Sequence, residues 1–137
     1  MTVKLVIVGC NACGAEWEDF EIHRDRPLCT TCGSRDHDAL LFGVAGKGGD
    51  LSRVPRDQRI AGAARLLGWD ASRSAHERGA FESYEGEDPN ELEAQAWLAT
   101  ERAHLHATLR KEGIIPTEEE EALASEAFTE GWLLFRP

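Results

Sequence analysis

The sequence predicts an α+β fold, in which a small N-terminal antiparallel sheet is followed by an all-α segment of three to four helices. Two observations predict this order. Residues 1–42 hold all four cysteines among short apolar runs, whereas apolar residues recur at helical spacing from residue 53 onward. Between them lies a glycine-rich stretch, GVAGKGGD. We therefore expect a cysteine-bearing domain at 1–42, a linker at 43–52 and an acidic helical domain at 53–137.

The cysteines form two pairs with one spacing, C-x2-C-x15-C-x2-C, made by Cys10, Cys13, Cys29 and Cys32. Each pair is followed directly by glycine, which readily adopts the left-handed conformation that a tight turn around a metal requires. Four thiolates complete a tetrahedral site and leave no open position, as is typical of structural zinc. One alternative is four unliganded thiols, which would leave suitable metal ligands unused. The other is a pair of disulfides, which would need an oxidising compartment that nothing in the sequence indicates.

Around these pairs the apolar residues alternate as in short strands. We expect a strand over Val3–Val8, a second after the first pair, and a return strand over Ala39–Phe42. The inward side chains of the second strand are expected to be Trp17, Phe20 and Ile22. The alternation shifts phase between Trp17 and Phe20, which predicts a bulge near Glu18 and Asp19.

The segment CNACG, the aromatic Trp17 and Phe20, and PLCTTCG resemble the rubredoxin-like zinc ribbons of small bacterial regulatory proteins and transcription-associated factors. The resemblance covers residues 3–42 and implies a metal site at the four cysteines. Proteins of this group bind proteins, DNA or RNA, or brace a neighbouring domain, so the resemblance implies no single activity. The helical remainder resembles no family.

The same cysteine turns resemble the iron site of rubredoxin and of the short terminal domain of rubrerythrin. Four thiolates hold iron as well as zinc, so both metals stay open. Glu101 and His104 form a Glu-x-x-His on an expected helix, but a di-iron bundle needs two such motifs and two further carboxylates. We therefore expect Glu101 and His104 to be an ordinary exposed pair.

Capping signals delimit the expected helices. The first is expected from Pro55 to Leu67 with Gly68 closing it, and a short second one over Ser72–Phe81. A third is expected from Asp88 to Glu112, ending at Gly113, with Trp97 beside a buried stripe at Leu98, Leu105 and Leu109. The last is expected to begin at Thr117 with a capping box to Glu120 and to end at Gly131. Because ARLLGW and AFTEGW share Gly-Trp and earlier alanines, both helix ends are expected to share one kind of C-cap.

Charge limits the partners. The chain carries 15 basic and 25 acidic residues, a net charge of −10, which repels nucleic acid at long range.

No run of residues has the length of a membrane span and no secretory signal is evident, so a cytoplasmic protein is expected. Neither a nucleophile motif nor a metal site with an open position is found, so an enzyme is not expected and no small-molecule substrate is evident.

Binding is the function that remains. We expect a protein-binding adaptor or regulatory module that uses the acidic ribbon loop, the acidic helical half and the apolar tail Trp132, Leu133, Leu134 and Phe135. An alternative is a DNA- or RNA-binding regulator, in which Arg56 and Arg59 share a helix face and contact phosphates, supported by Arg53, Arg65 and Arg73. The simpler expectation for these arginines is pairing with the protein's own acidic C-terminal half. A rubredoxin-like electron carrier is the third candidate.

Overall fold

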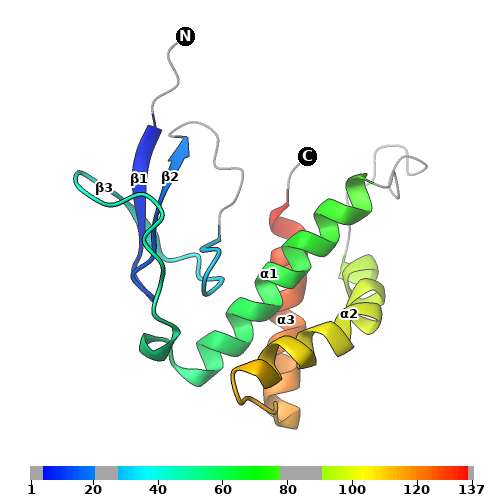
Figure 1. Ribbon diagram of the computed structural model, residues 1–137. Coiled ribbons are helices and arrows are strands. Elements are labelled where there is room, and N and C mark those ends of the chain that lie inside the picture. Colours follow the sequence, from blue (N-terminus) through cyan, green and yellow to red (C-terminus); the bar gives the residue numbers. More distant parts are fainter. Residues whose placement is uncertain (1–4, 21–27, 78–90, 136–137) are drawn as a thin grey trace. The chain divides into compact units, whose positions relative to one another are not determined.

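The computed structural model describes residues 5–20, 28–77 and 91–135. A three-stranded antiparallel sheet is followed by three α-helices, so the expected α+β class is confirmed (Figure 1). The chain divides into two compact units, residues 1–59 and residues 60–137.

The sheet of the first unit contains β1 (Leu5–Cys10), β2 (Glu16–Phe20) and β3 (His37–Leu40) in the order β2-β1-β3. Both neighbours of β1 are antiparallel to it, and Val8 pairs with Trp17 on one side and Ala39 on the other. Val8 is 2% exposed, as expected for the central strand of a small sheet. β1 thus delivers Cys10 directly from the sheet into the first cysteine turn.

Two details of the sheet differ from expectation. β1 and β2 pair residue for residue from Leu5 with Phe20 to Gly9 with Glu16, so the expected bulge at Glu18 and Asp19 is wrong for the described strands. The return strand is His37–Leu40 rather than Ala39–Phe42. Its pairing to β1 ends at Leu40, and the chain leaves the sheet before Leu41. Ile22 lies outside the described residues.

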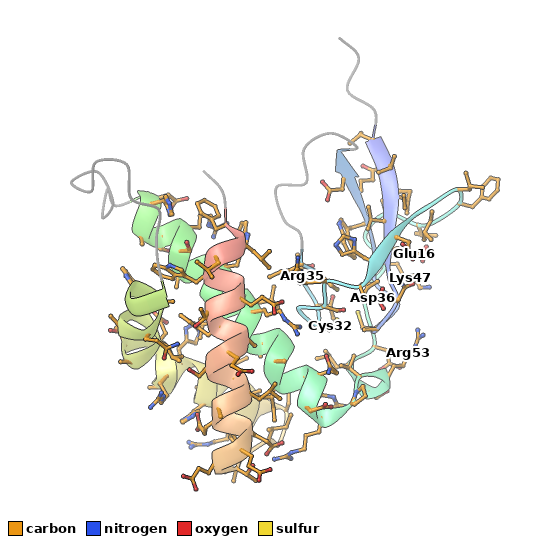
Figure 2. All side chains as sticks on the ribbon, turned by 180° about the vertical axis from the view of Figure 1, so that it is seen from behind. Glu16, Cys32, Arg35, Asp36, Lys47 and Arg53 are labelled. Carbon is orange, nitrogen blue, oxygen red and sulfur yellow. The ribbon has the colours of Figure 1, made fainter. Side chains whose placement is uncertain are left out.

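The glycine-rich connector hydrogen-bonds to the ribbon. Glu16 and Lys47 exchange backbone and side-chain contacts: the Glu16 N–H donates to the Lys47 carbonyl at 3.0 Å, and Lys47 Nζ lies 3.2 Å from Glu16 Oε2. Figure 2 shows these two side chains together. Farther on, a short 3₁₀ turn, η1 (Leu51–Arg53), begins at Asp50, whose carboxylate accepts the Ser52 N–H at 3.0 Å. The connector therefore has a defined backbone along the ribbon.

In the second unit, the first helix is longer than expected. α1 runs from Arg56 to Glu77, so Gly68 lies inside it and does not end it. The expected second helix over Ser72–Phe81 is, as far as residue 77, the continuation of α1, and residues 78–81 lie outside the described residues. Gly68 is buried because α3 packs against it. A glycine that a neighbouring helix covers need not interrupt a helix.

α2 (Glu91–Lys111) ends as the sequence predicts. Gly113 has φ +76°, the Gly113 N–H donates to the Arg110 carbonyl, and the Ile114 N–H donates to the Leu109 carbonyl. This pair of hydrogen bonds is the Schellman motif, in which a left-handed glycine ends the helix. The expected stripe is confirmed, since its three leucines, Leu98, Leu105 and Leu109, are at most 2% exposed. The expected cap at Asp88 lies outside the described residues.

α3 (Glu118–Leu134) begins as expected and ends later. The capping box is present, because the Glu120 N–H donates to Thr117 Oγ1 while Glu120 Oε1 accepts the Thr117 N–H. The helix continues past Gly131 to Leu134, so the expected end at Gly131 is wrong for the same reason as at Gly68. α1, α2 and α3 share one core that includes Ile60, Phe128 and Trp132.

Candidate metal centre

The four cysteines converge at one buried point of the first unit. One Sγ atom from each lies within 4.8 Å of the others, and the closest pairs, Cys10 with Cys32 and Cys13 with Cys29, are 3.6 Å apart. None is more than 4% exposed. Tetrahedral zinc with Zn–S bonds of about 2.3 Å separates its sulfurs by about 3.8 Å, close to these distances. The spacing of the sequence and the geometry of the fold therefore agree on one four-thiolate site.

Two turns of identical backbone pattern build the site. In the first, the Cys10 N–H donates to the Ala15 carbonyl and the Gly14 N–H donates to the Cys10 carbonyl. In the second, the Cys29 N–H donates to the Ser34 carbonyl and the Gly33 N–H donates to the Cys29 carbonyl. The two glycines have φ +83° and +72°, a left-handed conformation that other residues adopt at a cost. Each CxxCG segment thus fixes its own two sulfurs.

The connector covers the site. Leu51 and Val54 belong to the same apolar cluster as the four cysteines, with Trp17 and Ala12. A Cβ added at Gly49 would overlap Sγ of Cys13, and the Asp50 N–H donates to the Cys13 carbonyl at 2.9 Å. Residues 49–54 therefore form one wall of the site, whereas the sequence predicts a linker up to residue 52 and the helical domain from residue 53.

Hydrogen bonds connect the first cysteine turn with the residues that follow the second turn. The Asn11 side-chain amide donates to Asp36 Oδ1 at 2.9 Å and to Asp38 Oδ2 at 3.0 Å, and the Asn11 N–H donates to the Asp36 carbonyl. Beside them the His37 ring meets the Trp17 ring edge-on, with centroids 5.6 Å apart. Asn11, between the first two cysteines, thus orients the chain that leaves the other pair (Figure 2 shows Asp36 and Cys32).

Among the metal-free thiols, Cys29 ionises more readily than an ordinary cysteine, and Cys13 and Cys32 ionise less readily. A hydrogen bond from the Cys32 thiol lowers the pKa of Cys29 to about 4. Burial raises the pKa of Cys13 to about 11, and the hydrogen bond to Cys29 raises the pKa of Cys32. Several negative charges cannot share so small a buried volume without a cation among them. The donor set therefore fits a divalent soft metal, which Cys10, Cys13, Cys29 and Cys32 would hold.

Such a metal would cross-link the two cysteine turns. Because four thiolates fill a tetrahedral site, the centre would be closed. Among the described residues no other group of three or more His, Cys, Asp or Glu side chains has metal-binding geometry. Zinc and iron both suit four thiolates, and the geometry of the sulfurs does not separate them.

The structure gives contacts for most of the candidate arginines. Arg59 donates to the Val54 carbonyl at 2.8 Å, Arg65 pairs with Glu130 at 2.9 Å, and Arg73 pairs with Asp70 and Glu77. Arg56 is exposed, and the Arg53 guanidinium lies against Gly14. Pairing with the protein's own acidic C-terminal half, the simpler expectation, is seen for Arg65 with Glu130. Arg73 pairs instead with carboxylates of its own helix, and Arg59 with a backbone carbonyl.

The apolar tail is mostly part of the core. Trp132 is fully buried and its ring lies 5.8 Å from that of Trp97, while Leu133 packs against the same core. Phe135 contacts the Trp69 ring at 5.2 Å, and Leu134 is half-buried. These contacts remove Trp132 from the surface that a partner could touch.

Sequence reasoning missed the most exposed apolar residues. Leu41 and Phe42, expected inside the return strand, are 96% and 92% exposed, and Val44 is 65% exposed. We call Leu40–Val44 the apolar tip; Figure 1 shows the loop after β3 projecting from the sheet. The signal was the glycine at 43, directly after LLF, which marks a loop rather than a strand interior.

No helix in the described ranges is both long and apolar enough to cross a membrane. Comparisons with protein-family models, with curated proteins and with solved structures find no match for this chain. The likeness to a zinc ribbon consequently rests on the chain itself: four clustered cysteines in a small three-stranded antiparallel sheet.

Proposed function

We propose that this protein is a non-enzymatic, protein-binding adaptor, in which a metal-bound ribbon presents the apolar tip to a partner. The single observation that supports this proposal is the exposure of Leu41 and Phe42, two large adjacent apolar side chains that are more than nine-tenths exposed. Large apolar side chains gathered at one exposed point are typical of interaction surfaces. Zinc is the metal we propose for the site.

Burial of the tip would supply useful binding free energy. Fully burying a leucine or phenylalanine side chain contributes roughly 1.5–3 kcal/mol. Leu40 is 36% exposed at the base of the tip and Val44 is 65% exposed beyond it, so a partner that encloses the tip gains from more than two side chains. The cost of ordering the tip is small, because Val44 N–H and Lys47 N–H are already hydrogen-bonded.

Charge around the tip indicates the partner's chemistry. The sheet from which the tip extends carries acidic residues: Asp38 on β3 and Glu18 on β2 are exposed, and Asp19 on β2 is half-buried. Lys47, the basic residue nearest along the connector, is already paired with Glu16. We therefore propose a partner with an apolar hollow whose rim is basic, because opposite charges at the rim speed association and select the partner.

The test is quantitative affinity capture from the native cell with three forms of the full chain. These are the unaltered chain, the double variant L41S/F42S, and the matched control Ile115→Ser, which changes a 74% exposed residue of the other unit. We expect one stoichiometric protein to be retained by the unaltered chain and the control and lost by L41S/F42S. That protein, purified, must then bind the unaltered chain directly.

A partner captured equally well by L41S/F42S would contradict the proposed surface. Capture of nothing above background would contradict the adaptor function. Because Leu41 and Phe42 are exposed, their replacement should leave metal content and helical circular dichroism unchanged, which excludes misfolding as the cause of lost binding.

A further inference from the structure

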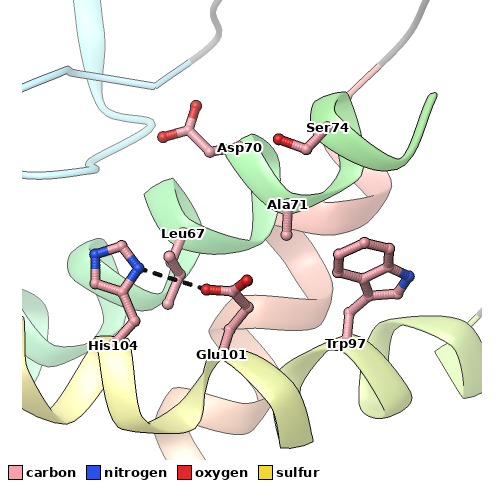
Figure 3. Close-up of a pocket in the computed structure, with 7 residues that line it drawn as sticks. All are labelled: Leu67, Asp70, Ala71, Ser74, Trp97, Glu101 and His104. Carbon is pink, nitrogen blue, oxygen red and sulfur yellow. Dashed lines mark hydrogen bonds and ion pairs between the residues drawn. The ribbon is translucent and has the colours of Figure 1, made fainter. Parts of the chain in front are cut away.

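A hollow of about 230 Å³ opens between α1 and α2 within the second unit (Figure 3). Leu67 and Ala71 point from α1 toward α2 and form its apolar floor. Trp97 forms one wall. The ring of Trp97 is held by its contact with the Trp132 ring, 5.8 Å away, and by packing against the core. The hollow therefore has a rigid aromatic side.

The acidic side chains that line the hollow favour a positively charged ligand. Glu101 lies one turn from Trp97 on α2, its side chain is 28% exposed, and His104 Nδ1 lies 3.4 Å from Glu101 Oε2. Asp70 lines the edge on α1. Among the described residues that line the hollow there is no arginine or lysine. An anion is therefore repelled, and an uncharged apolar ligand would have to desolvate a carboxylate at a cost.

A bare metal ion does not suit the hollow. Within the described part of the chain, metal-binding geometry is reached only by the four cysteines, so Asp70, Glu101 and His104 do not place three donor atoms around one point. A cation that spreads its charge and also offers an apolar face fits the combination of Trp97 with a carboxylate. A guanidinium group is planar and weakly hydrated, and it stacks on aromatic rings.

The same unit already holds a guanidinium in such surroundings. The Arg73 guanidinium lies over the Trp69 ring, 5.2 Å from its centroid, with Asp70 at 3.6 Å and Glu77 at 3.9 Å. The hollow offers comparable groups, which are the Trp97 ring, the Glu101 carboxylate and, at its edge, Asp70, which already pairs with Arg73. Among the described residues the hollow supplies the ring and the carboxylates, and its basic side chain is His104, 3.4 Å from Glu101.

We propose that the hollow between α1 and α2 is a binding site for a guanidinium group carried on an unbranched alkyl chain. The alkyl chain lies on Leu67 and Ala71, and the guanidinium lies against the Trp97 ring and donates to Glu101. The site is separate from the metal centre and from the apolar tip. Two sources share this chemistry, a free guanidino compound and an arginine side chain of a protein.

The test is titration of the metal-loaded full chain, followed by the indole N–H signals in two-dimensional NMR. The chain has four tryptophans, hence four such signals, and loss of one in Trp97→Leu identifies Trp97. The probes are N-acetyl-arginine amide, a five-residue glycine peptide with central arginine, and N-acetyl-citrulline amide. Citrulline has the shape of arginine without its charge.

We expect both arginine probes to shift the Trp97 signal saturably, with a dissociation constant below about 10 mM, and citrulline to leave it unmoved. A peptide at least tenfold tighter than the capped amino acid indicates a protein arginine as the source, whereas equal binding indicates a free guanidino compound. An unmoved Trp97 signal with arginine, or an equal shift with citrulline, would overturn the proposal.

Glu101→Gln keeps the shape of the site and removes its charge, and we expect about two- to fivefold weaker binding, the range of a partly exposed ion pair. The matched control is Glu119→Gln, which removes one exposed charge from α3. Equal weakening in both variants would show that only the net charge attracts the probe, and would overturn the site. Glu101→Gln also remains informative where Trp97→Leu disturbs the core.

Discussion

Gly68 of α1 and Gly131 of α3 occupy reciprocal positions where the two helices cross. A Cβ added at Gly68 would overlap the carbonyl oxygen of Phe128, three residues before Gly131, and a Cβ added at Gly131 would overlap the carbonyl oxygen of Arg65, three residues before Gly68. The two backbones therefore touch at both glycines. Figure 1 shows α3 crossing α1. The Gly-Trp shared by ARLLGW and AFTEGW therefore marks a contact between two helices and not two helix ends.

The first prediction concerns this crossing. In an ordinary helix interior, replacing glycine by alanine stabilises by roughly 0.5–1 kcal/mol. Here we expect Gly68→Ala and Gly131→Ala each to lower the free energy of unfolding by about 1–3 kcal/mol, because the helices must separate. Urea unfolding followed by circular dichroism at 222 nm measures the change. Gly48→Ala serves as comparator, since no atom lies within 4 Å of its added Cβ and its φ is not positive; a cost there as large as at Gly68 would contradict the close contact of the two helices.

Metal content is the second prediction. The full chain as isolated should contain one metal ion, and Cys29→Ser should contain almost none, because three thiolates leave the tetrahedral site incomplete. Binding of about 10–16 kcal/mol stabilises small zinc-binding peptides, so the ribbon signals in NMR should collapse with the metal. Elemental analysis and the visible spectrum are the measurements, with the conservative Thr30→Ser as control. A colourless protein with zinc supports the structural site, and iron with thiolate absorption would favour the electron carrier.

The third prediction compares neighbouring glycines of the connector. Gly49→Ala should weaken zinc affinity about tenfold or more, because its Cβ would overlap Sγ of Cys13 and overpacking costs about 1–3 kcal/mol. Gly48→Ala should leave affinity unchanged, since its added Cβ meets nothing within 4 Å. Competition with a chromophoric chelator measures both. Equal affinities would mean that residues 49–54 do not form a wall of the site in solution.

Zinc affinity should also depend on pH. With the pKa of Cys13 raised to about 11 and that of Cys32 raised above its usual 9.0, both thiols are protonated at pH 7, so binding must release at least these two protons. Affinity therefore falls as pH is lowered, by about 100-fold per pH unit between pH 6 and 8. If the metal-free ribbon unfolds, its thiols return toward their ordinary pKa values and the dependence is steeper. A pH-independent affinity, after correction for the chelator, would show that the thiols are already ionised.

The nucleic-acid alternative gives the fifth prediction. With a net charge of −10 and Arg59 donating to the Val54 carbonyl, we expect no measurable binding to a mixed-sequence DNA duplex or single-stranded RNA at 150 mM salt. Fluorescence anisotropy is the measurement. Binding that falls steeply with salt and is lost in the R56A/R59A variant would instead favour the regulator.

What the sequence determined by itself was local. The cysteine spacing with its following glycines is a short-range pattern, and it located the four-thiolate site because each CxxCG turn makes its own hydrogen bonds. The capping box at Thr117 and the glycine end at Gly113 are local in the same sense, since their partners lie within five residues along the chain. Such interactions leave the same residue pattern wherever they occur.

The tertiary structure decided what depends on residues far apart in the chain. A glycine can end a helix or can let a neighbouring helix approach closely. For Gly68 and Gly131, only the crossing of α1 and α3 distinguishes the two roles. Likewise the pattern Ala39–Phe42 suits a strand, but pairing with β1 stops at Leu40 and leaves Leu41 and Phe42 in solvent. Whether a side chain is buried, or a helix can approach closely, depends on residues from a distant part of the chain, and a local sequence pattern does not contain them.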